Sequence, residues 1–322
     1  FFLCAGGVAM YLTSRMNTEF WRSKWVYLYG LAVFLLSVTL VAGTTHGGGR
    51  RWLFLGPIGF QPSEFAKFVW IVAVARYLDR YHSRLRTVKW ALFYPLAIFL
   101  PLAALIAAEP DFGNPFVGFL VFFCLLLVSG IEWRYILVYP LVAIPAFGGL
   151  ILAKPYRMAR MLSFFNLWRG VSEDQLARNG APYQVAQALV ALGSGGFFGK
   201  GLGESDLKLH YLPQPHTDFI FPVIGEELGF AGSALVIVLY SLVAICGMRV
   251  AYKTERLFNK FLAFGITLNI VLQAAIHMAV TTALAPTKGI TLPFLSYGGS
   301  SLVISCMMAG VLLRLSRLQE SR

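Results

Sequence analysis

An aspartate and a histidine stand at the start of an apolar stretch, in the segment YLPQPHTDFIFPVIGEELG from Tyr211 to Gly229. Asp218 directly follows His216 and Thr217, where polar residues give way to apolar ones. A carboxylate in such a place costs free energy unless it is paired, hydrated or used in chemistry. One interpretation is a general base that takes a proton from a hydroxyl group. The other is a cap that complements the dipole of the helix that follows.

Two further acids, Glu226 and Glu227, follow within the same apolar stretch. At the rise of an α-helix they lie about 12 Å from Asp218 along the helix axis. Adjacent residues of a helix point in different directions, so at most one of these acids can face a cavity squarely. We expect one of them to form a structural ion pair with a cation of a polar loop, and a proton relay is the alternative.

A second group of residues, suited to anion binding, occupies the segment GGGRRWLFLGPIGFQPSEFAK from Gly47 to Lys67. Arg51 and Lys67 carry positive charges that suit a phosphate or pyrophosphate group. Glu64 and Lys67 are spaced i, i+3, which places them on one face of a helix. An exposed pair of this kind contributes less than about 1 kcal/mol. At a membrane boundary we expect the pair to be buried and to position its neighbours.

Two more segments combine polar residues with turn-forming ones. In KGITLPFLSYGGSS, from Lys288 to Ser301, a proline and paired glycines predict irregular backbone, which a membrane protein tolerates where that backbone lines a cavity. In EPDFGN, from Glu109 to Asn114, Asp111 lies in a tight turn between two apolar stretches. Its carboxylate is an acid at the membrane interface that could contact a ligand, and a plain turn residue is the alternative.

Two other patterns favour structural roles. The glycine-rich run GSGGFFGKGLG, from Gly193 to Gly203, lacks the strand and helix that flank a dinucleotide-binding turn, so we reject a nucleotide site. Asn269, Gln273 and His277 recur every four residues and form a polar stripe on one face of a predicted helix. Hydrogen bonding between helices is the favoured interpretation of this stripe, and the lining of a hydrophilic groove is the alternative.

Membrane-spanning helices are the elements that must hold these residues. The 322-residue chain is 57% hydrophobic and 13% charged, whereas soluble domains carry about 25% charged residues. One helical crossing needs about 20 apolar residues, and backbone within lipid must satisfy its own hydrogen bonds. We therefore predict an all-α polytopic membrane protein. The predicted spans are Phe1–Thr13, Trp25–Ala42, Ser63–Arg76, Ala91–Ala108, Phe112–Ser129, Tyr135–Leu152, Phe219–Met248, Phe261–Leu284 and Ser300–Leu313.

Basic residues separate two kinds of loop. Most arginines and lysines flank the spans on one side, which the positive-inside rule makes the cytoplasmic side, together with the C-terminus. The opposite, extracytoplasmic face carries Thr44–Pro62, residues 154–218 and Ala285–Gly299. We expect residues 154–218, a large loop within a single domain of residues 1–322, to pack on the helices and hold amphipathic or re-entrant segments. The extracytoplasmic cations that topology does not require are Arg50, Arg51, Lys67, Arg157, Arg160, Arg169, Lys200, Lys208 and Lys288.

Neither the net charge nor the cysteines indicate a function in nucleic-acid binding or a structural zinc site. The net charge of +12 does not indicate nucleic-acid binding, because many cations lie beside spans, where topology and anionic head groups account for them. The four cysteines fall inside apolar segments, where cysteine behaves as a small hydrophobic residue. We therefore expect no disulfide and no structural zinc.

Taken together, these segments resemble the SEDS (shape, elongation, division and sporulation) family, across essentially the whole chain. PTKG at Pro286–Gly289, together with GEELG, resembles the cell-division branch more than the elongation branch. Members have about ten transmembrane helices, so the start at Phe1 implies that a first helix and part of a second precede this sequence. The motifs that carry the resemblance are GRRW (Gly49–Trp52), FQPSEFAK (Phe60–Lys67), PDFG (Pro110–Gly113), YQ (Tyr183–Gln184), GSGG (Gly193–Gly196), HTDFIF (His216–Phe221), GEELG (Gly225–Gly229) and LPFLSYGGSS (Leu292–Ser301).

The resemblance implies a peptidoglycan glycosyltransferase that polymerises lipid II for the division septum, with inversion at the sugar and release of undecaprenyl pyrophosphate. The essential aspartate of the family's HTDF motif is Asp218 here, which implies a general base for the acceptor hydroxyl. A divalent cation, Mg²⁺ or Mn²⁺, could assist the leaving group, although the sequence shows no clear ligand set. The substrate-binding residues that we expect are Arg51, Glu64, Lys67, Asp111, Arg157, Arg160, Tyr183, Gln184, Ser194, His216, Lys288 and Ser296.

Within that set, the roles follow from side-chain chemistry. Arg51, Lys67 and either Arg157 or Arg160 would hold the pyrophosphate of the donor or the acceptor, with Glu64 positioning Lys67. The side chains of His216, Ser194 and Ser296 would shape the cavity.

Some positions depart from the family pattern. Gln214 and Pro215 replace a glutamate-containing motif before HTDF, Glu109 replaces a usual glutamine, Asn114 replaces a usual threonine, and Pro222 is unexpected. These departures bear on acceptor contacts and loop geometry, and they leave the proposed base in place.

The expected partners are a class B penicillin-binding protein, which is a transpeptidase, and other membrane proteins of the division machinery. A lipid II flippase is the main alternative, because broken helices and polar stripes also serve translocation. A scaffold without activity is a third hypothesis. The gathering of acids and bases near one face, rather than through the midplane, favours the polymerase.

Overall fold

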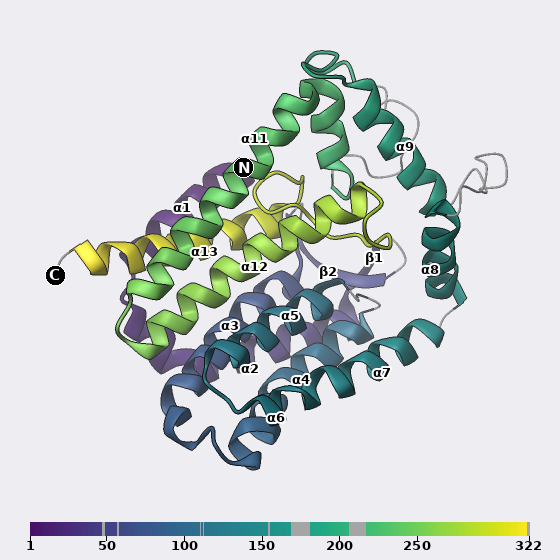
Figure 1. Ribbon diagram of the computed structural model, residues 1–322. Coiled ribbons are helices and arrows are strands. Elements are labelled where there is room, and N and C mark those ends of the chain that lie inside the picture. Colours follow the sequence, from purple (N-terminus) through teal and green to yellow (C-terminus); the bar gives the residue numbers. More distant parts are fainter. Residues whose placement is uncertain are drawn as a thin grey trace. The chain divides into compact units, whose positions relative to one another are not determined.

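The computed structural model describes residues 1–46, 49–56, 58–109, 111, 113–153, 155–168, 181–205 and 217–320. It is built mainly of helices (Figure 1). The chain divides into two compact units, and it passes between them several times. Unit 1 comprises Phe1–Tyr139, Val243–Leu272 and Gly298–Arg322, and unit 2 comprises Pro140–Leu242 and Gln273–Tyr297. The single-domain organisation expected from the sequence stays a prediction.

Each of the nine predicted spans coincides with a helix. In the described part of the chain, six helical stretches are long and apolar enough to cross a membrane, and α5 (Gly113–Val128) is a shorter apolar helix. Of the remaining two, α1 (Phe2–Arg15) has 14 residues, and α3 (Pro62–Tyr81) carries charged residues in its first and last turns. The six stretches are Thr18–Ala42 (α2), Lys89–Ala108 (a π-helical turn and α4, Tyr94–Ala108), Trp133–Leu152 (α6, Trp133–Ile136, and α7, Val138–Leu152), Ile220–Lys253 (α11), Leu257–Thr281 (α12) and Gly299–Gln319, within α13 (Gly299–Glu320).

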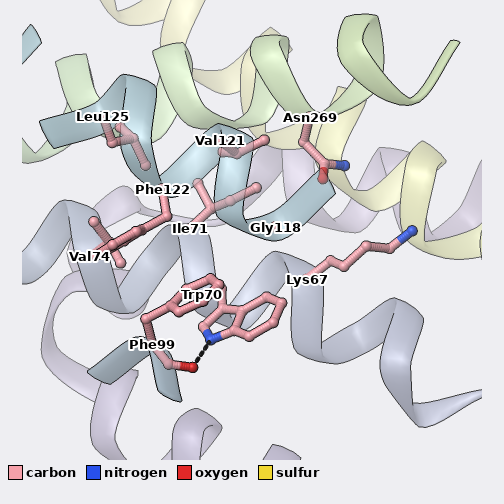
Figure 2. A pocket seen from close by; sticks show the side chains of 10 residues that line it. All are labelled: Lys67, Trp70, Ile71, Val74, Phe99, Gly118, Val121, Phe122, Leu125 and Asn269. Carbon is pink, nitrogen blue, oxygen red and sulfur yellow. Dashed lines mark hydrogen bonds between the residues drawn. The ribbon is translucent and has the colours of Figure 1, made fainter. Parts of the chain in front are cut away.

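The core of unit 1 forms around α3. Its residues from Ala66 to Ala75 are all buried, although its ends are polar. The Trp70 indole stacks on the Phe99 ring of α4 with ring centroids 4.8 Å apart, and its Nε1 donates a hydrogen bond of 3.2 Å to the Phe99 carbonyl (Figure 2). Gly118 of α5 admits this indole, because a Cβ there would lie 2.5 Å from the Trp70 ring. Stacked aromatic rings and a small residue thus hold three helices together.

The first and last helices of unit 1, α1 and α13, pack side by side (Figure 1). A Cβ on Gly310 of α13 would lie 2.0 Å from Thr13 Oγ1 and 2.3 Å from the Met10 carbonyl oxygen. Thr13 Oγ1 in turn donates a hydrogen bond of 3.1 Å to the Met307 carbonyl. Close backbone approach at a glycine is a common way for helices to associate in lipid, where apolar burial gives little drive.

A small antiparallel sheet replaces the loop that we expected over Thr44–Pro62. Its strands are β1 (Thr44–His46), β2 (Gly49–Leu55) and β3 (Ile58–Phe60), in the order β1-β2-β3. Thr44 pairs with Trp52, and Leu53 pairs with Phe60. No strand was predicted within this loop, because β1 and β3, of three residues each, are too short to show the alternating pattern by which a sequence indicates a strand, and β2, GRRWLFL, does not alternate.

The described residues of the predicted large loop, which belongs to unit 2, include two helices. These are α8 (Pro155–Trp168) and α9 (Ala181–Ser194), which contact each other. The prediction that this loop holds structured segments is therefore confirmed. The unit also contains most of α7, the first part of α11, the end of α12 and an irregular segment over residues 285–297.

Candidate functional site

Asp218 lies in the turn Thr217–Phe219, directly before α11 begins at Ile220, and its side chain is half-buried. The unexpected Pro222 falls in the first turn of this helix, where the missing N–H has no intrahelical partner in any helix. The positive end of the helix dipole favours a carboxylate here. The placement therefore suits a negatively charged Asp218, and it is compatible with both the cap and the base.

The segment over residues 285–297 is tied to the backbone beside Asp218 by one buried serine. Ser296 Oγ donates a hydrogen bond of 2.7 Å to the Thr217 carbonyl. The same Oγ accepts a hydrogen bond of 2.7 Å from the Leu292 N–H. A hydroxyl that both donates and accepts in this way fixes two backbone segments against each other. Ser296 was predicted from its motif to shape the site.

Gly289 lies against the Asp218 carboxylate. A Cβ at this position would lie 2.7 Å from Asp218 Oδ2 and 3.3 Å from its Cγ. Ordinary contact starts at about 3.4 Å, so the carboxylate occupies the space that any other side chain would need. The adjacent Lys288 is half-buried. This contact could not be predicted from the sequence, because glycine in PTKG fits a turn equally well.

Two members of the polar stripe on α12 bind this same irregular segment. Gln273 Nε2 donates to the Thr291 carbonyl at 2.9 Å and to its Oγ1 at 3.1 Å. His277 Nδ1 lies 2.6 Å from the Ile290 carbonyl oxygen. Asn269, in unit 1, donates a weak hydrogen bond of 3.7 Å to Met308 Sδ on α13. The interhelical interpretation is confirmed for Asn269, whereas these bonds of Gln273 and His277 hold irregular backbone.

A buried ion pair lies at the start of α3 in unit 1. Lys67 Nζ is 2.9 Å from Glu64 Oε1, and the two side chains are 1% and 6% exposed. The expectation of a buried pair is therefore confirmed. Lys67 and Asn269 also line a cavity of about 10 Å³ among apolar side chains (Figure 2), which is about the room that one water molecule needs.

The turn after α4 holds a second polar cluster of unit 1. Arg51 Nε, on β2, donates a hydrogen bond of 3.0 Å to the Glu109 carbonyl. The Glu109 side chain is fully buried, and among the described residues its carboxyl oxygens have no hydrogen-bond partner. Burial, with a contribution from Asp111 and against an opposing one from Arg51, raises the pKa of Glu109 to about 8. A neutral Glu109 at physiological pH can both donate and accept, as a glutamine does.

Asp111 caps the start of α5. Its Oδ1 accepts hydrogen bonds from the Gly113 N–H at 3.0 Å and the Asn114 N–H at 3.3 Å, and its Oδ2 accepts from Asn114 Nδ2 at 2.8 Å. Asn114 Nδ2 also lies 3.4 Å from Ser63 Oγ at the start of α3. These contacts favour the structural interpretation of Asp111, and they link the EPDFGN turn to the helix that carries Glu64 and Lys67.

Five of the remaining predicted residues lie on α8 and α9 of unit 2. Arg157 Nη1 donates a hydrogen bond of 2.5 Å to the Leu150 carbonyl in the last turn of α7, and Arg160 is exposed on the same helix as Arg157. Ser194 Oγ donates to the Ala191 carbonyl at 2.9 Å. Tyr183 and Gln184 are half-buried on α9. His216 lies outside the described residues.

The predicted structural ion pair of α11 forms at Glu226. Its Oε1 is 2.7 Å from Lys200 Nζ, and its Oε2 accepts a hydrogen bond of 2.6 Å from Ser205 Oγ. A cation of an outer loop was predicted as the partner of one acid, whereas the contact with Ser205 was not predicted. In the part of the chain that the structure describes, no three His, Cys, Asp or Glu residues gather where they could hold a metal ion.

The predicted site residues thus form two sets. In unit 1 the structure brings Glu64 to Lys67, and it places Arg51 and Asp111 near Glu109. In unit 2 it brings Ser296 to the backbone beside Asp218, with Lys288 next to Gly289. The fold and these sites define a polytopic, helical membrane protein whose polar residues gather at helix starts and in turns.

Comparison with known proteins agrees with this class. Residues 1–321 match the model of the FtsW/RodA/SpoVE family, which is described as a cell cycle protein family. The chain belongs to this family. The chain is 44% identical over 321 residues to a probable peptidoglycan glycosyltransferase FtsW of Halomonas elongata, covering 98% of this chain and 78% of that one. It is 37% identical over 314 residues to the stage V sporulation protein E of Bacillus subtilis, covering 97% and 84%.

Solved structures show the same fold. The rod shape determining protein RodA of Thermus thermophilus is similar with a TM-score of 0.70 and 29% identity, over 98% of this chain and 85% of that one. A chain in a structure of a peptidoglycan synthase complex, which concerns the coordination of polymerization and crosslinking, matches with a TM-score of 0.82 and 27% identity. That match covers 100% of this chain and 89% of the other.

Proposed function

We propose that this protein is a peptidoglycan glycosyltransferase that polymerises lipid II for the division septum. The observation that carries the proposal is the placement of Asp218, at the start of α11, packed against Gly289 and held through Ser296. Relatives with 40% and 44% identity over almost the whole chain are named probable peptidoglycan glycosyltransferases FtsW, which supports the reaction class.

In the proposed reaction, Asp218 takes the proton from the 4-hydroxyl of the acceptor sugar. The acceptor oxygen then forms a bond to the anomeric carbon of the donor, with inversion, while the bond from that carbon to the pyrophosphate oxygen breaks. The electron pair of the broken bond leaves with undecaprenyl pyrophosphate, which needs positive charge nearby. Arg157, Arg160 and Lys288, in the same unit as Asp218, are proposed for this role. Arg51 and Lys67, in unit 1, stay proposed for pyrophosphate binding on the sequence motifs.

A divalent cation stays part of the proposal only as an aid to the leaving group. The described carboxylates offer no ready set of ligands for it. Asp111 is engaged in capping α5, and Glu226 is engaged with Lys200 and Ser205.

The proposed topology has the C-terminus in the cytoplasm and the reaction on the extracytoplasmic side of the plasma membrane, as the distribution of basic residues indicates. The proposed partner is a class B penicillin-binding protein. Support for a partner comes from the similarity to a chain of a peptidoglycan synthase complex that polymerises and crosslinks. Other membrane proteins of the division machinery are further proposed partners.

The test is glycan formation from purified lipid II by the full-length protein together with its cognate transpeptidase. Wild type should form polymer, and a folded Asp218→Asn variant should form none. Glu204→Gln, which neutralises an exposed acid in the described part of the same unit, is the matched control and should be active. Normal polymerisation by Asp218→Asn would refute the base. No polymer from wild type, with labelled lipid II crossing liposomes, would favour the flippase.

A further inference from the structure

The helix that follows Asp218 is broken two turns after it starts. At Gly229 the backbone has φ 68° and ψ −161°, which is not helical, and this break divides α11 into a short segment, Ile220–Leu228, and a long one, Phe230–Lys253. A break of this kind leaves carbonyl and N–H groups without their intrahelical partners. Within a membrane protein those groups must be satisfied by another part of the chain.

The glycine-rich turn Gly195–Gly201 supplies these partners. It accepts hydrogen bonds from the first N–H groups of the long segment, and it donates hydrogen bonds to the last carbonyl groups of the short segment. The four bonds are Phe230 N–H to Gly196 O at 2.9 Å, Ala231 N–H to Phe197 O at 3.1 Å, Lys200 N–H to Glu226 O at 2.9 Å and Gly201 N–H to Glu227 O at 3.1 Å.

Glycine is needed in this turn because the two backbones touch. A Cβ at Gly195 would lie 2.0 Å from the Gly225 carbonyl oxygen, and one at Gly199 would lie 2.1 Å from the Glu227 carbonyl oxygen. Gly199 also has a φ of 84°, which residues with a side chain rarely adopt. The GSGG and GEELG motifs are therefore two halves of one contact.

A side-chain latch joins the same two regions. Glu226 is 2% exposed, and its two carboxylate oxygens are 2.7 Å from Lys200 Nζ and 2.6 Å from Ser205 Oγ. Ser205 is fully buried. A buried carboxylate that contacts both a cation and a hydroxyl is held in one orientation. The latch thus fixes the end of the short segment opposite to Asp218.

We propose that Lys200 and Ser205, acting through Glu226, are positioning residues for Asp218. The short segment transmits their effect, because a helix is rigid. It begins at Ile220, two residues after Asp218, and Glu226 lies six residues, or about 9 Å, further along it. One end of the segment is fixed by the latch and the other by the Ser296 bond to Thr217. The inference rests on the proposed role of Asp218 as the base.

The test compares polymerisation kinetics of full-length variants with the cognate transpeptidase and purified lipid II. Glu226→Ala removes both side-chain contacts, and Lys200→Met removes the cation. We expect kcat to fall tenfold or more in each, with KM within about twofold of wild type, because a misplacement of about 1 Å can cost up to 100-fold in rate. Glu226→Gln, which keeps an oxygen acceptor, should recover part of the loss. Glu204→Gln is the matched control and should keep the kcat of wild type.

The pH profile of kcat separates positioning from loss of structure. Movement of Asp218 relative to the start of α11 should shift the acidic limb of the profile. Simple unfolding should lower the active fraction and leave the shape of the profile unchanged. A folded Glu226→Ala variant with the kcat and pH profile of wild type would overturn the proposal.

Two controls keep the outcome clear. If Glu226→Ala does not fold, Ser205→Ala takes its place, because it removes one hydrogen bond and leaves the ion pair. We expect a loss of severalfold in its kcat, and an unchanged kcat would refute the latch. Asp218→Asn is measured beside these variants. If it is inactive while the latch variants behave as wild type, only this inference fails; if it is active, the proposed function fails first.

Discussion

Substitution of Gly289 by alanine should lower the rate of glycan synthesis without unfolding the protein. The new Cβ would lie 2.7 Å from Asp218 Oδ2, and ordinary contact starts at 3.4 Å, so the carboxylate must move by about 0.7 Å, the difference between these distances. Since a displacement of about 1 Å can cost 100-fold, we expect kcat to fall by about tenfold to 100-fold. This corresponds to about 1.4 to 2.7 kcal/mol in the activation free energy.

The fold should tolerate this change, because the φ of Gly289 lies outside the left-handed region. Alanine also lowers the entropy of the unfolded chain, which stabilises the folded state by up to about 1 kcal/mol. The assay is polymerisation of lipid II by the full-length protein and its transpeptidase, with thermal unfolding in detergent as the measure of folding. Gly30→Ala, where the added Cβ meets nothing within 4 Å, is the matched control. A folded Gly289→Ala variant with the kcat of wild type would show that the reaction does not depend on this placement of Asp218.

Three further predictions concern stability, measured by thermal unfolding in detergent. Lys67→Met should destabilise the protein by about 3 to 5 kcal/mol, because it leaves Glu64 buried without its cation. The double variant Lys67→Met with Glu64→Gln should recover most of this stability, and an equal loss in the single and the double variant would contradict the buried pair. Between about pH 5 and pH 8 the stability of wild type should fall as pH rises. In the unfolded chain Glu109 ionises over this range, whereas the folded carboxyl, with its pKa raised to about 8, stays protonated. Glu109→Gln should lose this dependence of stability on pH, and an unchanged dependence would show that another group causes it. Gly310→Ala should lower the free energy of unfolding by about 1 to 3 kcal/mol through overpacking, whereas Gly7→Ala, with open space around its Cβ, should leave it unchanged. Equal effects of the two substitutions would argue against close packing of α1 and α13.

The amino-acid sequence by itself determined the membrane class, the positions of the helical spans and the motifs that carry the family resemblance. These features are local, because about 20 consecutive apolar residues suffice to specify a crossing. The buried Lys67–Glu64 pair was predictable in the same way, since a spacing of three residues within one helix brings the side chains together whatever the rest of the fold does.

Contacts between distant segments were decided only by the tertiary structure. The sequence indicated that Gly193–Gly203 is a turn, but its seating in the break of α11 at Gly229 depends on backbone that lies about 30 residues further along. In the same way, the polar stripe of α12 predicted hydrogen bonds but not their partners. The tertiary structure shows that Gln273 bonds to the Thr291 carbonyl and that His277 contacts the Ile290 carbonyl. Local propensity specifies which residues are helical or polar, whereas a pairing across the chain depends on how the helices pack and on which backbone groups a break leaves unsatisfied.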